Sequence, residues 1–198
     1  MAIRDEKTKE RLLVCAIRHF AEQGYAATNL AEIAKEEGVT RGPLYYYFTD
    51  KAALYRACVQ RVIEENKKAY SRILVEGRPF LEMLREDFSY CLQDKGLFSR
   101  IGNGGKDEPD MTAACREFTH WLLQLKYRVF SYAKERGELP PSCDLSELIT
   151  FIYIYYHGVI QVKQLAEEVD GFSRSMLDDS VDVFVDLIRK KFIEQSPQ

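Results

Sequence analysis

The chain has 198 residues, of which 46% are hydrophobic and 30% are charged. This composition excludes a disordered chain, and at roughly 100–150 residues per domain the length suits one large domain or a small one joined to a larger one. The net charge of −3 does not mark a nucleic-acid binder, but residues 1–68 hold 12 Lys and Arg against 10 Asp and Glu, whereas residues 69–198 hold 16 against 21. This distribution is compatible with a small basic patch for nucleic acid on an otherwise acidic protein.

The N-terminal residues are charged and lack the apolar stretch of a signal peptide. The most apolar run, residues 149–162, contains His157 and Gln161 and is shorter than the roughly 20 apolar residues that a membrane helix needs. The five cysteines are odd in number and far apart, so neither a zinc motif nor a complete disulfide framework is expected. We expect a cytoplasmic protein with reduced, mostly buried thiols.

Apolar positions recur every three or four residues along almost the whole chain, which predicts an all-α fold. Gly24 and Gly38 would end the first two helices, Thr40 and Asp50 would cap the next two, and Pro79 would open the fifth. The expected helices span about residues 5–23, 29–38, 40–48, 50–75, 79–93, 110–136, 144–168 and 173–194. Because the first helices are short and the later ones long and aromatic-rich, we expect a small domain over 1–50 and a larger one over 51–198.

Residues 28–51 contain two short helices joined by a turn at Gly38-Val39, which is the layout of a helix-turn-helix. Leu44 and Phe48 lie four residues apart and would share a core with Val39. Tyrosines 45–47 cannot all be buried on so short a helix, and exposed phenols near basic side chains suit phosphates and base edges. A helix-turn-helix used only for packing is the alternative.

The first turn of the second short helix contains Gly42 and Pro43. A proline is tolerated there, because the N–H that it lacks would have no partner within the helix. Gly42 would let the backbone approach a neighbour closely, either a DNA backbone or the preceding helix.

Four ordered motifs carry a family resemblance: Phe20-Ala-Glu-Gln-Gly-Tyr, Thr28 followed by Leu30-Ala-Glu-Ile-Ala, Gly38-Val-Thr-Arg-Gly, and Leu44-Tyr-Tyr-Tyr-Phe followed by Lys51. Together they cover about residues 8–58, and this part resembles the DNA-binding head of the TetR/AcrR family of transcriptional regulators. The remaining residues are similar to the family only in their helical layout. In that family the second part binds a small molecule and forms the dimer.

The resemblance implies a role in DNA binding for each matched residue. Thr28, Tyr45 and Lys51 would contact phosphates, and Arg41 would read a guanine by a bidentate contact. Pro43 departs from the threonine or alanine that is frequent at its position, so a hydroxyl contact is lost there. The full set is Thr28, Thr40, Arg41, Gly42, Pro43, Tyr45, Tyr46, Tyr47 and Lys51.

The aromatic second part predicts a pocket between its long helices for a flat or cationic lipophilic ligand. The candidate lining residues are Tyr70, Phe80, Met83, Phe88, Phe118, Trp121, Tyr127 and Tyr156. The candidate polar contacts are Glu82, Asp87, Glu117, His120 and Gln124. For each of these residues, core packing is the alternative.

Residues 151–158, Phe-Ile-Tyr-Ile-Tyr-Tyr-His-Gly, are apolar around more than one face of their helix and so need cover on two sides. We expect a homodimer through the helices at about 144–168 and 173–194, in which Gly158 permits a close helix approach. Burial inside a monomer is the alternative.

These features predict a sequence-specific regulator, a repressor released from a near-palindromic operator by a small aromatic or lipophilic ligand. An effector-independent architectural or cell-cycle factor of the same fold is the alternative. Gly102-Asn-Gly-Gly-Lys106 lacks the features of a phosphate loop and is interpreted as a surface loop. We expect no enzyme, cofactor or metal site, because no nucleophile–base pair is evident and His19, His120 and His157 lie far apart without a carboxylate or cysteine at ligand spacing.

Overall fold

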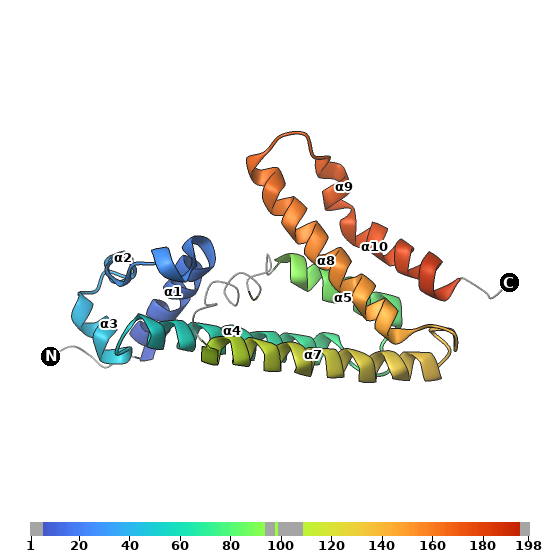
Figure 1. Ribbon diagram of the computed structural model, residues 1–198, viewed down its shortest axis with the longest axis horizontal. Coiled ribbons are helices and arrows are strands. Elements are labelled where there is room, and N and C mark those ends of the chain that lie inside the picture. The colour runs from blue at the N-terminus through green and yellow to red at the C-terminus, as the bar shows by residue number, and fades with distance from the viewer. Residues whose placement is uncertain (1–5, 94–97, 99–108, 195–198) are drawn as a thin grey trace. The chain divides into compact units, whose positions relative to one another are not determined.

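The computed structural model describes residues 6–93, 98 and 109–194, and over these residues the fold is all-α, as expected (Figure 1). The helices are α1 (Glu6–Ala27), α2 (Leu30–Glu36), α3 (Arg41–Tyr47), α4 (Lys51–Ile73), α5 (Phe80–Gln93), α7 (Pro109–Glu135), α8 (Leu145–Glu168), α9 (Arg174–Asp178), α10 (Ser180–Ile188) and the π-helical turn η1 (Arg189–Ile193). The expected loop at 102–106 lies outside the described residues. No helix in the described part of the chain has the length and apolar content needed to span a membrane.

The expected end of the first helix at Gly24 is confirmed by its backbone, since the non-helical angles of Gly24, φ 77° and ψ 170°, interrupt α1 before its short continuation to Ala27. Another expected helix is divided. The single helix expected at 173–194 is broken at Asp179, which ends α9 and precedes α10. Aspartate is a poor helix former, and two aspartates stand side by side at this break.

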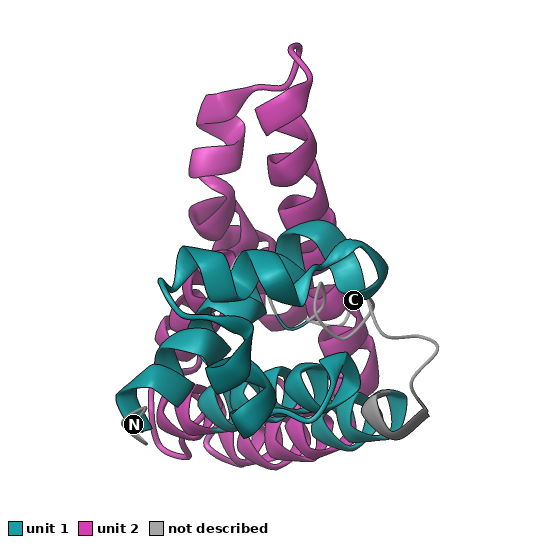
Figure 2. Cartoon of the chain, turned by 90° about the vertical axis from the view of Figure 1, so that its left-hand side faces the viewer, with its two compact units in different colours: residues 1–67, 97–119 teal, residues 68–96, 120–198 magenta. Residues whose placement is uncertain are grey.

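The chain forms two compact units (Figure 2). Unit 1 comprises residues 1–67 and 97–119, and unit 2 comprises residues 68–96 and 120–198. Helix α4 therefore contributes residues to both units. The domain boundary placed after residue 50 stays a prediction.

The core of unit 1 joins α1, α2, α3 and the first half of α4. Its innermost side chains are fully buried and include Leu12, Phe20, Ile33, Leu44 and Tyr55. The Phe20 and Tyr55 rings meet edge to face, with centroids 5.0 Å apart. Burying aromatic rings of this size contributes much of the stability of a small unit.

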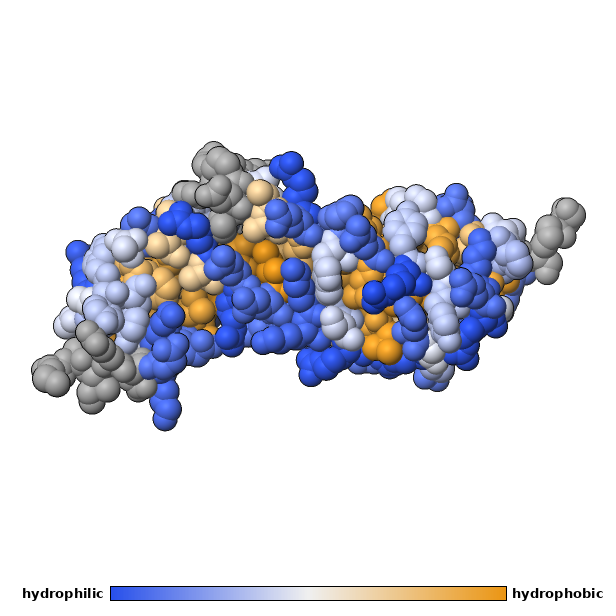
Figure 3. All heavy atoms as spheres, turned by 90° about the horizontal axis from the view of Figure 1, so that it is seen from below, coloured by the Kyte–Doolittle hydropathy of each residue, from blue (hydrophilic) through white to orange (hydrophobic). Residues whose placement is uncertain are grey.

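The core of unit 2 is built from aromatic side chains of α5, α7, α8 and α10. Phe88 stacks on Tyr156 with ring centroids 4.2 Å apart, and Phe184 packs against both rings. Phe80 meets Phe130 edge to face at 5.1 Å. On the face seen in Figure 3, apolar side chains show in patches between hydrophilic ones, as amphipathic helices produce.

Candidate nucleic-acid interface

Helix α1 holds the C-terminal end of α2 through charged side chains. Arg11 donates from Nε to Glu37 Oε2 at 2.9 Å and from its terminal nitrogen to the Glu37 carbonyl at 2.8 Å. One residue earlier, Glu36 accepts from Arg18 and lies 2.9 Å from His19 Nε2. These contacts fix the point at which the chain turns toward α3.

The turn between α2 and α3 is set by Gly38. Its φ of 67° is a left-handed conformation that glycine adopts without strain. The Val39 N–H donates to the Ala34 carbonyl at 2.9 Å, and the Gly38 N–H donates to the Lys35 carbonyl at 3.1 Å. This pair of bonds is a Schellman motif, which satisfies the last carbonyls of α2 and fixes the direction in which α3 leaves.

Helix α3 has one buried side and one exposed side. Leu44 and Phe48 are 1% and 5% exposed, which confirms their predicted place in the core. Tyr45 and Tyr46 are 50% and 61% exposed, and Arg41 is exposed as well. The buried side of α3 therefore holds the helix in place, and its other side presents the guanidinium of Arg41 and the phenols of Tyr45 and Tyr46 to solvent. Tyr47 is half-buried, and its ring meets Tyr46 edge to face at 5.2 Å.

The N-terminus of α3 differs from the prediction in one detail. Thr40 occupies the N-cap position, but its side chain makes no capping hydrogen bond, so its predicted capping role is wrong. Its backbone has ψ 168°, and the side chain is exposed. Pro43 is the third residue of the helix, where the N–H that it lacks is not needed.

Gly42 is exposed and faces open space within its own chain. A Cβ added to Gly42 would meet only Thr40 Oγ1, at 3.8 Å, which is an ordinary contact. Of the two neighbours considered for Gly42, the preceding helix is thus not close. The space beside Gly42 is therefore accessible to a molecule outside the chain, and the approach of a DNA backbone stays a prediction.

An open hollow of about 500 Å³ lies beside α3. Its lining includes Thr28, Asn29, Arg41, Tyr45 and Lys51. Two cationic side chains and a phenol therefore converge on a space that can admit a phosphate group. The neighbouring Asp50 also lines the hollow, but its Oδ1 already accepts from the Ala53 N–H at 2.7 Å.

Lys51 and Thr28, which are predicted to contact phosphates, already have hydrogen-bond partners within unit 1, whose residues 6–58 we call the head. Lys51 Nζ donates to the Ala26 carbonyl at 3.0 Å and lies 4.8 Å from the Tyr25 ring centre, and burial lowers the pKa of Lys51. Thr28 is buried, and its hydroxyl donates to the Gly24 carbonyl at 2.7 Å. Their contacts with phosphate stay predictions.

Residues 12–58 match the family model described as bacterial regulatory proteins, tetR family. The chain is 46% identical to the HTH-type transcriptional regulator AcrR of Shigella flexneri over 50 residues, which cover 25% of this chain and 23% of AcrR. It is 28% identical to the HTH-type transcriptional repressor ComR of Escherichia coli over 155 residues, 73% of each chain. A TetR transcriptional regulator from Chloroflexus aurantiacus has the same fold, with a TM-score of 0.77 at 16% identity over 94% of this chain and 96% of that one.

The DNA-binding region at residues 12–58 belongs to the TetR family. The chain is a DNA-binding transcriptional regulator and not an enzyme. Regulators of this family bind DNA as dimers and respond to small-molecule effectors.

A buried polar cluster lies inside unit 2. Asp87 of α5 and Lys126 of α7 are 0% and 2% exposed, and Lys126 Nζ pairs with Asp87 Oδ2. The Tyr156 hydroxyl donates to the same oxygen at 3.1 Å. Among the described residues, Asp87 Oδ1 and the Tyr153 hydroxyl are buried without hydrogen-bond partners. Burial and the nearby Asp87 charge raise the pKa of Tyr156 and of Tyr153, so both phenols stay protonated.

The predicted ligand-lining residues do not all meet at this cluster. Tyr156 contacts Asp87 directly, Phe88 stacks on Tyr156, and the Tyr70 ring centre lies 6.0 Å from Lys126 Nζ. Of three others, Phe80 packs on Phe130, Tyr127 is 39% exposed, and Trp121 is half-buried. Met83 is buried in unit 2, whereas Phe118 belongs to unit 1 and packs on Phe98. Of the predicted polar contacts only Asp87 is buried; Glu82, Glu117, His120 and Gln124 are exposed.

Lys126 and Tyr153 are the cluster residues that sequence analysis missed. A signal for Lys126 was available, because it lies between Leu122, Leu125 and Val129 on the buried stripe of its helix. A lysine on one apolar stripe and an aspartate on another indicate a buried ion pair. Nothing in the local pattern around Tyr153 marked its hydroxyl as buried.

The Gly42→Ala substitution separates folding from DNA binding. Alanine fits the space and favours a helix over glycine, so the free energy of unfolding should stay the same or rise by up to about 1 kcal/mol. DNA affinity should fall, because the new methyl group would occupy the space in which we expect the DNA backbone to approach. Thermal unfolding and fluorescence anisotropy with labelled duplex DNA measure the two effects. A variant that is destabilised, or that binds DNA as tightly as the wild type, would contradict this role of Gly42.

The buried ion pair predicts non-additive stability changes. Lys126→Met alone leaves the Asp87 charge buried and unpaired, which should cost about 3–5 kcal/mol. Combining it with Asp87→Leu should recover most of that loss, since an apolar pair of similar volume is often neutral. Denaturant unfolding can be followed by the fluorescence of Trp121, the single tryptophan, which lies in the same unit. Equal losses that simply add in the double variant would show that the two charges are not coupled.

Proposed function

We propose that this regulator is a repressor that binds a near-palindromic operator as a homodimer and is released by a small aromatic or lipophilic ligand. The observation that carries the proposal is the geometry of α3. Its buried side holds the helix rigidly, while Arg41, Tyr45 and Tyr46 project from the other side. A helix supported in this way can enter the major groove and read base edges with its first residues.

Exposed apolar side chains of α8 and α9 support the dimer. Ile154 and Met176 are 68% and 65% exposed, and Leu165 is 46% exposed. Gly158 lies four residues after Ile154 on the same face, and a Cβ added there would meet no atom within 4 Å. Exposed apolar surface of this kind marks an interaction site, and a second copy of the same helices would cover it. The two-fold symmetry of such a dimer requires an operator of two inverted half-sites.

The Asp87 cluster supports an effector site in unit 2. Lys126 neutralises the carboxylate, which disfavours a ligand that relies on positive charge alone. The unpartnered Asp87 Oδ1 and Tyr153 hydroxyl favour a neutral aromatic ligand that carries a hydrogen-bond donor.

Helix α4 offers a route from this cluster to the DNA. Its residues run from Lys51, at the hollow beside α3, to Tyr70, whose ring faces Lys126. A ligand that shifts Tyr70 would tilt α4 and change the spacing of the two heads. The ligand must then bind the state that does not fit DNA more tightly, and DNA must weaken the ligand by the same factor.

The test compares two variants that change different kinds of contact. Arg41→Ala should lower the discrimination against a wrong base at one operator position by about 1–3 kcal/mol. Tyr45→Phe keeps the ring and removes one hydroxyl, so it should weaken binding to all duplexes to a similar extent. Affinities are measured by fluorescence anisotropy on duplexes that differ by one base pair, and thermal unfolding confirms that each variant is folded.

Uniform loss of affinity in Arg41→Ala, with every base preference intact, would contradict the assigned reading role. Sequence-specific binding that no small molecule relieves would instead favour the effector-independent factor of the same fold.

A further inference from the structure

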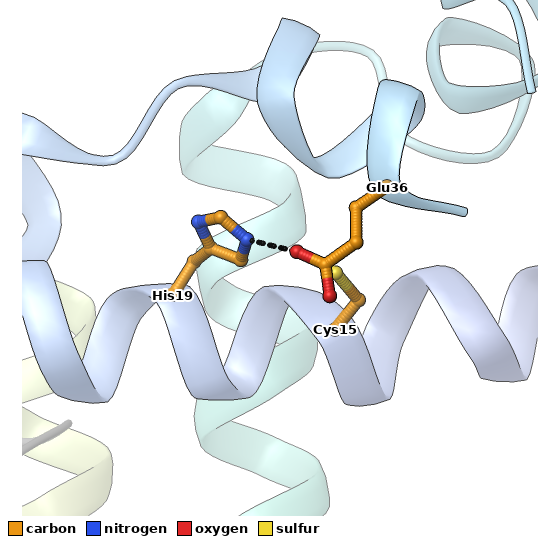
Figure 4. A group of neighbouring side chains, drawn as sticks. All are labelled: Cys15, His19 and Glu36. Carbon is orange, nitrogen blue, oxygen red and sulfur yellow. Dashed lines mark hydrogen bonds and ion pairs between the residues drawn. The ribbon is translucent and has the colours of Figure 1, made fainter. Parts of the chain in front are cut away.

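A cluster of three potential metal ligands lies between α1 and α2 in unit 1. Cys15 Sγ, one ring nitrogen of His19 and one carboxylate oxygen of Glu36 all lie within 4.8 Å of one another (Figure 4). Cys15 and His19 are four residues apart on one face of α1, and Glu36 is the last residue of α2. The prediction that His19 has no cysteine or carboxylate at ligand spacing is therefore wrong.

We infer that Cys15, His19 and Glu36 form a binding site for a divalent transition metal of the zinc type, which fastens α1 to α2. Thiolate, imidazole and carboxylate are the three protein ligands that zinc uses. Around a tetrahedral zinc, donor atoms at their usual bond lengths lie about 3.4–3.6 Å apart. The three atoms lie within 4.8 Å of one another, so side-chain adjustments of about an ångström reach this spacing, and the exposed side of Glu36 leaves a fourth position for water.

The surroundings of His19 suit a metal ligand. Nε2 is the nitrogen that faces Glu36, at 2.9 Å, so it is the one available for the metal. The other ring nitrogen, Nδ1, lies 3.4 Å from the Gln23 side-chain amide. When a metal takes Nε2, the imidazole proton must be on Nδ1, and Gln23 can accept it there with its amide oxygen turned toward the ring.

Arg18 is the competing cation. Its guanidinium pairs with Glu36 Oε1 and lies 3.8 Å from Cys15 Sγ, so it occupies the side of the site on which a metal would sit. Because the Arg18 side chain is 52% exposed, it can turn into solvent when the metal arrives. Burial raises the pKa of the Cys15 thiol, and metal binding must therefore release that proton to water as the metal–sulfur bond forms.

Metal at this site would act on the part of the head that positions α3. Cys15 and His19 are 3% and 8% exposed, and Glu36 precedes the turn at Gly38 by two residues. A ligand that binds only the folded head stabilises it in proportion to the logarithm of the metal concentration above Kd. This inference does not depend on the operator or the effector, since it concerns metal binding alone.

The experiment titrates the full-length chain with Co²⁺ under reducing conditions and then competes with Zn²⁺. One equivalent of Co²⁺ should give a thiolate-to-cobalt charge-transfer band and the intense visible bands of tetrahedral cobalt, and Zn²⁺ should abolish both. Zn²⁺ should also raise the unfolding temperature. A spectrum without the thiolate band would overturn the inference.

Four variants distinguish a metal site from a structural ion pair. Glu36→Gln changes an exposed ligand and should weaken Co²⁺ binding by at least about tenfold, whereas Arg18→Gln removes the competing cation and should strengthen it. Cys15→Ser should remove the thiolate band, and Cys115→Ser, a half-buried cysteine outside the cluster, should keep it. A band that persists in Cys15→Ser, or equal effects of Glu36→Gln and Arg18→Gln, would show that these residues serve only as an ion pair.

Discussion

Helix α3 has seven residues, and a helix of that length is not stable in water by itself. Its conformation depends on the burial of Leu44 and Phe48 against the core that Phe20, Ile33 and Tyr55 provide. Everything that the head presents to solvent follows from this burial. With one side of the helix fixed, Arg41 and the exposed tyrosines have defined directions, and a contact surface with defined directions can distinguish base pairs.

Polar contacts at the C-terminal end of α2 also help to position α3. Arg11 and Arg18 pair with the last residues of α2, and the Schellman motif at Gly38 then sets the angle between α2 and α3. Exposed ion pairs contribute little stability individually. Their value here is positional, because they gather at the single turn from which α3 departs. The Cys15–His19–Glu36 cluster lies at that turn as well, so metal binding would strengthen an arrangement that the ion pairs already favour.

Much of the head could be predicted from sequence because its signals are local. The glycine at 38, the cap position at 40 and the i, i+4 pair Leu44 and Phe48 each depend on residues a few positions apart. The interruption of α1 at Gly24 is a local signal of the same kind, since a glycine there is free to take the positive φ that ends a regular helix.

The features that the sequence did not reveal depend on residues far apart in the chain. Asp87 meets Lys126 across 39 positions, and Arg18 meets Glu36 across 18. The periodicity of apolar residues within one helix does not specify which other helix its buried face packs against. The break at Asp179 is similar, because the apolar period continues through it and does not specify the ψ of 0° at Asp179 that separates α9 from α10.

We propose that the head reads DNA sequence in two symmetric copies. Selection of bound duplexes from a random DNA pool, with the full-length chain, is the decisive test. We expect enrichment of an inverted repeat whose half-site centres lie about one helical turn apart, or a multiple of it. A folded protein that enriches no sequence, or only a single unrepeated half-site, would contradict the claim.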